Sequence, residues 1–204
     1  MSQTLRKGRR ADPSKDEAIL EAASDLFTKR GYSVSIDDIA AAASVSKQTI
    51  YARYASKHDL LAAVIHKTAE DLVSALSIGS APPEEALIKF GERFVEVVFN
   101  PAKVAMQRLI ISEAAQFPEL ARAYYENGPQ FVRQKLAAYI ERASAGGKLK
   151  ANDAATAASQ FLGLIIGADH MTTLMGVELE EDAPSRRKRI RAAVDAFLRL
   201  YAPQ

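Results

Sequence analysis

Apolar residues recur three and four positions apart along almost the whole chain, between serines, prolines and glycines that can begin or end helices. This spacing places apolar side chains on one face of an α-helix. In the segment 13–30, for example, that face consists of Ile19, Ala22, Ala23, Leu26 and Phe27. No stretch shows the alternation of apolar and polar residues that is typical of a half-buried β-strand. We therefore predict an all-α fold of about nine helices.

The ends of these helices can be predicted from capping residues and prolines. Serine and asparagine accept hydrogen bonds at a helix N-terminus, and proline favours the first helical position. These rules place helices after Ser35, Ser46, Ser56 and Asn100, after Asn152 or Asp153, and from Pro118 with a kink at Pro129. The helix after residue 153 is expected to end near Gly176, and the last helix to span about 185–201. The prolines at 82 and 83 predict a hinge between domains.

The composition excludes several classes of protein. With 48% hydrophobic and 25% charged residues, the 204-residue chain can bury a proper core. Because cysteine is absent, disulfide frameworks and thiolate chemistry are excluded. The longest apolar run, 161–168, is far shorter than the ~18 residues that span a bilayer, and the polar N-terminus does not resemble a signal peptide. We expect a soluble cytoplasmic protein with no membrane partner.

Positive charge is concentrated at the N-terminus. Five basic residues and one acidic residue lie within positions 1–15, whereas basic and acidic residues are equal in number over 61–204. This distribution fits an arm that contacts phosphate groups. Charge alone leaves open the alternative of a solvated tail.

Residues 36–54 predict two short helices that are separated by a tight turn and cross closely at the small residues Ala40 and Ala43. This is the arrangement of a helix-turn-helix, whose second helix enters the major groove of DNA. Polar side chains in its first turn could contact base edges, and later tyrosine and basic residues could donate to phosphates. The alternative is a surface helix whose polar residues are only solvated. The candidate DNA contacts are Ser35, Ser46, Lys47, Gln48, Thr49, Tyr51, Arg53, Tyr54 and Lys57.

The residues Asp38-Ile39-Ala40 and the run 45–60, VSKQTIYARYASKHDL, match two motifs without a gap. The motifs are D-I-A and V-S-K-x-T-[IL]-Y-x-x-[FY]-x-[ST]-K-x-x-L. Through them, the segment 19–64 resembles the DNA-binding domain of the TetR family of transcriptional regulators. The family usually has glycine where Ser44 stands, and a left-handed conformation there would cost this residue ~1 kcal/mol. Gln48 also replaces a common glycine, which adds a side chain that could contact a base.

The resemblance implies a homodimer, an inverted-repeat DNA operator and a C-terminal helical domain that binds a small effector. We accordingly expect a basic arm at 1–12, a three-helix DNA-binding domain at 13–60, and an effector-binding and dimerisation domain at 61–204. Gly163 and Gly167, together with the apolar face of the last helix, suggest the dimer interface. Side chains that could line a site for an apolar or aromatic effector, or simply form the core, are Phe94, Met106, Tyr124, Phe131, Phe161 and His170.

Enzymatic function finds no support in the sequence. The phosphate-binding, nucleophile and zinc-protease motifs are absent. His58, His66 and His170 do not have the spacing of metal ligands on one helix, so we expect no metal and no cofactor. We predict a sequence-specific transcriptional regulator, a repressor that a small hydrophobic effector releases from its operator. The alternative is a helical adaptor that does not bind DNA.

Overall fold

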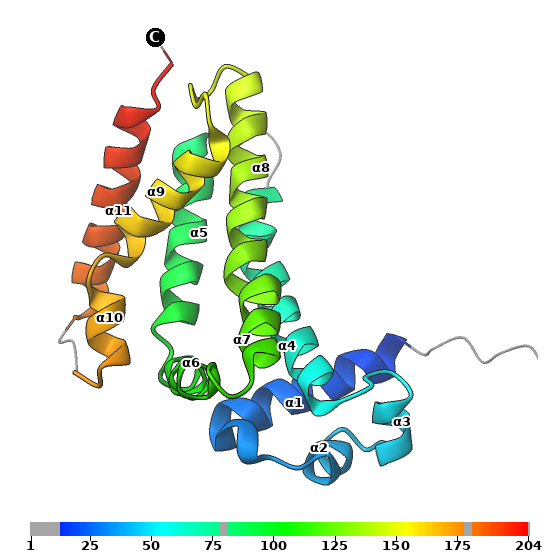
Figure 1. Cartoon of the computed structure of the whole chain (residues 1–204). Helices are drawn as coiled ribbons and strands as arrows, with labels where there is room; N and C mark the ends of the chain where they lie inside the picture. The colour runs from blue at the N-terminus through cyan, green and yellow to red at the C-terminus, as the bar shows by residue number, and fades with distance from the viewer. Residues whose placement is uncertain (1–12, 78–80, 178–180, 204) are drawn as a thin grey trace, which may run out of the picture.

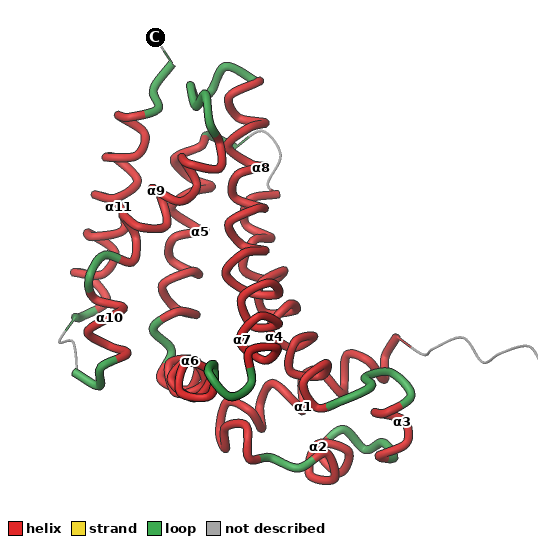
Figure 2. The backbone as a smooth tube through the Cα atoms, in the orientation of Figure 1, coloured by secondary structure: helices red, strands yellow, loops and turns green. Residues whose placement is uncertain are grey.

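The computed structural model describes residues 13–77, 81–177 and 181–203, so the basic arm at 1–12 lies outside the described residues. All regular structure in these ranges is helical, which confirms the all-α fold (Figures 1 and 2). The α-helices are α1 (Pro13–Arg30), α2 (Ile36–Ala42), α3 (Lys47–Tyr51), α4 (Lys57–Val73), α5 (Pro83–Val98), α6 (Pro101–Glu113), α7 (Pro118–Tyr125), α8 (Phe131–Ala145), α9 (Ala154–Ile166), α10 (Asp169–Leu174) and α11 (Ala183–Leu200). Two short 3-10 helices, η1 (Gly31–Ser33) and η2 (Ser74–Ser77), and one π-helical turn, η3 (Glu126–Gln130), connect them.

The predicted capping residues are confirmed. The Ser35 hydroxyl accepts a hydrogen bond from the backbone N–H of Asp38 at 3.1 Å, and the Asp38 carboxylate accepts one from the Ser35 N–H at 3.2 Å. This reciprocal pair satisfies two donors at the start of α2. The remaining caps are Ser46 on α3, Ser56 on α4, Asn100 on α6 and Asp153 on α9.

Two helical predictions need correction: the end of the helix after residue 153 and the total number of helices. The apolar helix that was expected to continue to Gly176 ends as α9 at Ile166, because Gly167 adopts a left-handed φ of 59° and the chain re-enters a helix only at α10. The kink predicted at Pro129 is confirmed, and it takes the form of η3 between α7 and α8. A π-helical turn accommodates proline, which lacks an N–H and crowds the preceding turn of a regular helix. These breaks raise the number of α-helices in the described ranges from the expected nine or so to eleven.

The first hydrophobic core joins the N-terminal helices to the rest of the molecule. It is built mainly from α1 to α3 and the first half of α4, and it also takes in Met106, Ile110 and Leu120 of α6 and α7. Figure 1 shows these helices gathered at the lower end of the molecule. The N-terminal helices therefore rest on side chains that come from well beyond residue 60.

The second core lies among α5, α8, α9 and α11, which form the long body in Figure 1. The ring of Phe161 is fully buried there, 6.1 Å from the ring of Phe90 and 5.0 Å from that of Phe197. Helix α4 contributes to both cores, with Leu61 and Val64 in the first and Leu72 in the second. A movement of α4 must therefore involve both ends of the molecule.

None of the helices in the described ranges is both long and apolar enough to cross a membrane.

Candidate functional site

Helices α2 and α3 are held against α1 by a small apolar cluster in which Ile39 and Ile50 are fully buried. The turn between them passes through Ser44, which has a φ of 53° and is the non-glycine residue with a positive φ in the described ranges. The N–H of Val45 then donates to the carbonyl oxygen of Ala40 at 3.0 Å and closes the turn. The turn that the family builds with glycine is thus made here by a strained serine.

The outward face of α3 carries the polar residues that were predicted to meet bases. Gln48 is exposed and makes no side-chain hydrogen bond within the described part of the chain, and Tyr51 is 47% exposed. Ser46 is exposed at the N-terminus of α3, where its hydroxyl lies 2.8 Å from that of Thr49. A helix end with free amide and phenol groups on one face has the shape and chemistry to enter a DNA groove.

Two of the predicted cationic contacts are already paired with carboxylates of neighbouring helices. Lys47 Nζ lies 2.9 Å from Asp37 Oδ2, and Arg53 Nε lies 2.6 Å from Asp16 Oδ1. The hydrogen bond and charge of Asp37 raise the pKa of Lys47. A DNA phosphate must therefore compete with these carboxylates for the two cations.

Lys57 and Tyr54 are turned toward the protein rather than fully toward solvent. The Lys57 ammonium group donates to the carbonyl oxygen of Tyr32 and lies 4.1 Å from the centre of the Tyr32 ring. Burial lowers the pKa of Lys57. Tyr54 packs half-buried against the first core, and burial raises the pKa of its phenol. These two residues support the position of α3 at least as much as they offer donors to phosphate.

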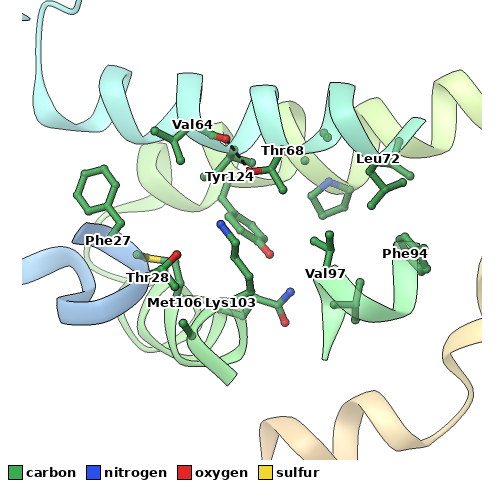
Figure 3. A pocket seen from close by; sticks show the side chains of 18 of the residues that line it. Phe27, Thr28, Val64, Thr68, Leu72, Phe94, Val97, Lys103, Met106 and Tyr124 are labelled. Carbon is green, nitrogen blue, oxygen red and sulfur yellow. Dashed lines mark hydrogen bonds between the residues drawn. The ribbon is translucent and has the colours of Figure 1, made fainter. Parts of the chain in front are cut away.

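A cavity of about 260 Å³ lies between the two cores, bordered by α1 and α4 on one side and by α5, α6, α7, η3, α8, α9 and α10 on the others. Its lining is mostly apolar, which suits an apolar ligand. Of the predicted effector contacts, Phe94, Met106, Tyr124 and His170 line this cavity (Figure 3 labels the first three).

The other two predicted effector contacts do not line the cavity. Phe161 is enclosed in the second core, and Phe131 packs edge-on against His66 with 4.5 Å between ring centres. Both residues lie on helices that border the cavity, but the turn of each helix directs the side chain elsewhere.

A small polar group interrupts the apolar lining. His170 Nε2 lies 2.8 Å from Gln107 Oε1, and Gln107 also hydrogen-bonds Tyr124. Burial raises the pKa of Tyr124 and lowers the pKa of His170, so both side chains are kept neutral. Lys103, one turn before Gln107 on α6, lines the same cavity.

Lys103 and Gln107 were not among the site residues predicted from the sequence. Lys103 lies three residues before Met106 and four residues before Gln107, which places all three on one side of α6. That spacing is the signal that could have identified them once Met106 had been selected.

A second hollow, of about 470 Å³, lies beside α6, α10 and α11, but its basic groups are already occupied. Arg108 Nε donates to the carbonyl oxygen of Leu174 at 2.8 Å, and Arg189 Nε donates to Glu181 at the same distance. The Arg189 hydrogen bond lowers the pKa of Glu181. Within the basic run 186–189, Arg186 and Arg189 are both paired with Glu181. Across the described ranges, no three His, Cys, Asp or Glu side chains are grouped to hold a metal.

Comparison with known protein families identifies both halves of the chain. The model "Bacterial regulatory proteins, tetR family" matches residues 19–64, and the model "AefR-like transcriptional repressor, C-terminal domain" matches residues 85–203, more than half of the chain. The chain belongs to the TetR family. This is a family of transcriptional regulators and not of enzymes, and membership implies operator DNA and dimerisation. The alternative of a helical adaptor that does not bind DNA is therefore dropped.

Individual relatives agree with this assignment over nearly the full length. The solved structure of the Flavonoid-responsive Regulator FrrA is 34% identical, and the match covers 95% of this TetR-family chain and 100% of that one, with a TM-score of 0.68. A TetR-family regulator from Mesorhizobium loti is 27% identical over 95% and 98% of the two chains, with a TM-score of 0.74. YvkB, an HTH-type transcriptional regulator of Bacillus subtilis, is 25% identical over 74% of this chain and 79% of its own.

Proposed function

We propose that this TetR-family regulator is a repressor that binds an inverted-repeat operator as a homodimer and leaves it when a small aromatic molecule enters the cavity. One observation carries the proposal: the cavity shares side chains with the first core, on which the DNA-binding helices α2 and α3 rest. Phe27 of α1 and Leu61 and Val64 of α4 line the cavity, and the same three residues are buried in the core that holds α2 and α3. A ligand in the cavity therefore bears directly on the base of the DNA-binding helices.

The comparisons support the direction of regulation and the kind of effector. The family model that covers the C-terminal part describes a repressor, and FrrA is by its name a regulator that responds to flavonoids. Flavonoids are compact aromatic molecules, and the cavity here is mostly apolar with a few polar groups. A site of about 260 Å³ is slightly smaller than the ~300–1,000 Å³ usual for small-molecule sites, so a compact ligand fits it best.

At the operator, α3 would lie in the major groove. Gln48 and Thr49 at its N-terminal end would contact base edges, and Tyr51 would reach the flanking backbone. Lys47 and Arg53 would exchange their carboxylate partners for phosphates. Helices α2 and α3 would be held at the correct angle by Ser35, Ser46, Tyr54 and Lys57. These side chains would also donate hydrogen bonds to the DNA backbone.

The homodimer would form through the outer faces of α9 and α11. Leu164 is 39% exposed and Leu200 is 68% exposed, and a Cβ on Gly163 would meet no atom within 4 Å in this chain. Apolar groups and small residues on neighbouring helix faces favour close helix packing between two copies. The symmetry of such a dimer would set the spacing of the two operator half-sites.

Release would follow from a shift between two conformations. A ligand can move the equilibrium only if it binds one conformation more tightly than the other. Here the ligand would favour a position of α4 at which the two α3 helices no longer match the half-site spacing. A coupling free energy of ~1–3 kcal/mol between the two sites is enough to lower operator occupancy.

The test begins with selection of bound DNA from a random pool by the full-length protein. We expect enrichment of an inverted repeat, dimeric binding, and an affinity that falls steeply with the logarithm of salt concentration. Binding of one protomer per site, a flat salt dependence or the absence of any enriched sequence would overturn the DNA half of the proposal. Transcription from the selected operator should fall when the protein is present, and a rise instead would identify an activator.

A further inference from the structure

Among the residues that the structure describes, Lys103 is the charged side chain in the mostly apolar lining of the cavity, and no Asp or Glu lines it. Figure 3 shows it extending from α6 into the cavity, toward Tyr124. Within the described part of the chain, its ammonium group makes no ion pair and no hydrogen bond. By contrast, Lys29, Lys47, Lys67 and Lys89 on the outer surface all lie beside a carboxylate.

An ammonium group in these surroundings has lost part of its hydration without gaining a partner. Burial lowers the pKa of Lys103, and no carboxylate of the described ranges lies beside it to counteract this effect. Such a residue destabilises the empty site. An anionic oxygen placed beside it would restore the lost interaction, and the surrounding apolar groups would strengthen the attraction.

The neutral groups near Lys103 are arranged to receive the same oxygen. Gln107 Oε1 is engaged by His170, and the Gln107 side chain also interacts with Tyr124. The Tyr124 hydroxyl can donate its hydrogen to a further acceptor. Its pKa is raised by burial, so that hydrogen stays in place. One cation and one neutral donor thus line the same part of the cavity.

We propose that the effector is an aromatic or apolar molecule with a single anionic oxygen group, a carboxylate or an ionised phenol, which binds between Lys103 and Tyr124. This inference rests on the proposed function of the cavity as the effector site, and it names the chemical class of the ligand. The apolar body of the ligand lies against Phe94, Val98, Leu162 and Ile166. The anionic group gives orientation and specificity, and the apolar wall provides most of the buried area.

The experiment uses matched pairs of small aromatic probes. Benzoate, cinnamate and 2-naphthoate are each compared with the corresponding carboxamide, and 4-nitrophenol with 4-nitroanisole. Binding to the full-length protein is measured by calorimetry and by the shift in melting temperature. The variants are Lys103→Met, which keeps length and removes charge, Lys103→Arg, which keeps charge, and Lys89→Met as a surface control.

We expect at least one anionic probe to bind the wild-type protein about tenfold or more tightly than its neutral partner. This preference should disappear in Lys103→Met and persist in Lys103→Arg and Lys89→Met. Because methionine removes an unpaired charge from an apolar site, Lys103→Met should melt no lower than wild type. Equal binding of the paired probes, an unchanged preference in Lys103→Met, or no binding by any probe would overturn the inference.

The same compounds are then added to the protein–operator complex, which separates this inference from the proposed function. Neutral probes that bind the cavity and release the operator would support the proposed function and overturn the role of Lys103. Anionic probes that bind through Lys103 and leave operator affinity unchanged would support the role of Lys103 and overturn release by the effector.

Discussion

Gly128 and Ile65 are in direct contact: a Cβ placed on Gly128 would lie 3.1 Å from Cγ2 of Ile65. The two residues join η3, the π-helical turn, to α4, and both line the cavity. Because ordinary contacts between carbon atoms are ~3.5–4.0 Å, only glycine allows α4 to approach this closely. The position of the helix that connects the cavity to the DNA-binding core thus depends on a missing methyl group.

The first prediction concerns this contact. Gly128→Ala should lower the stability of the protein by ~1 kcal/mol, because the added methyl overpacks the interface with Ile65. In an Ile65→Ala background the same change should be neutral or stabilising, since alanine is favoured over glycine in helices by ~0.5–1 kcal/mol. Thermal unfolding of the four proteins at one fixed concentration measures the coupling. Additive effects of the two substitutions would show that the contact does not restrain α4.

The second prediction concerns the strained turn of the helix-turn-helix. Ser44→Gly should stabilise the protein by ~1 kcal/mol, because glycine adopts the left-handed conformation at little cost. The matched control is Ala43→Gly, one residue earlier, where φ is −80° and glycine should destabilise. Urea unfolding compares the two variants with wild type. A loss of stability in Ser44→Gly would mean that the serine side chain contributes more than its backbone strain removes.

The third prediction concerns the carboxylate that holds Lys47. Asp37→Asn should raise the affinity for all DNA sequences, because it frees the Lys47 ammonium group and removes a negative charge close to α3. Asp71→Asn, which breaks a comparable surface pair with Lys67 on α4, should leave DNA affinity unchanged. Fluorescence anisotropy with operator and random duplexes measures both. Weaker binding by Asp37→Asn would show that Asp37 positions Lys47 for DNA instead of competing with it.

The fourth prediction concerns base readout at α3. Gln48→Ala should lose ~1–3 kcal/mol of discrimination at one base position in each half-site. Tyr54→Phe should weaken binding to all sequences alike if its hydroxyl donates to phosphate. Selection experiments with each variant check both results. An unchanged base preference in Gln48→Ala would show that this exposed amide remains solvated on DNA.

The fifth prediction concerns pH. Burial lowers the pKa of His170 in the folded protein, so the unfolded chain takes up the proton first as the pH falls. The neutral form therefore contributes stability that is complete above the ordinary histidine pKa of ~6.5 and is lost as the pH falls below it. His170→Gln should reduce the fall in melting temperature between pH 7 and pH 5, roughly the range in which an ordinary histidine titrates. The control is His58→Gln on the exposed side of α4, and an equal fall in His170→Gln and wild type would contradict the argument.

Much of the local structure followed directly from the sequence. The caps at Ser35, Ser46 and Ser56 each join a side chain to a backbone N–H three residues later, so neighbours in sequence suffice to predict them. At Ser44 the family motif has glycine, and the structure retains the positive φ there in spite of its cost to serine. The break at Gly167 was not visible, since glycine is tolerated within helices as well as at their ends.

The cavity depended on how the helices pack. Phe94 and Phe161 occupy similar apolar positions in the sequence, yet one lines the cavity and the other is enclosed in the core. Lys103 lies among residues that are distant in the chain, and the absence of a carboxylate beside it cannot be known until α4, α7 and α9 are placed around α6. Short-range hydrogen bonds and periodicity determine where each helix begins and which side is apolar. Contacts between segments far apart in the chain decide whether an apolar side packs against a neighbouring helix or lines the cavity. These contacts exist only in the folded molecule.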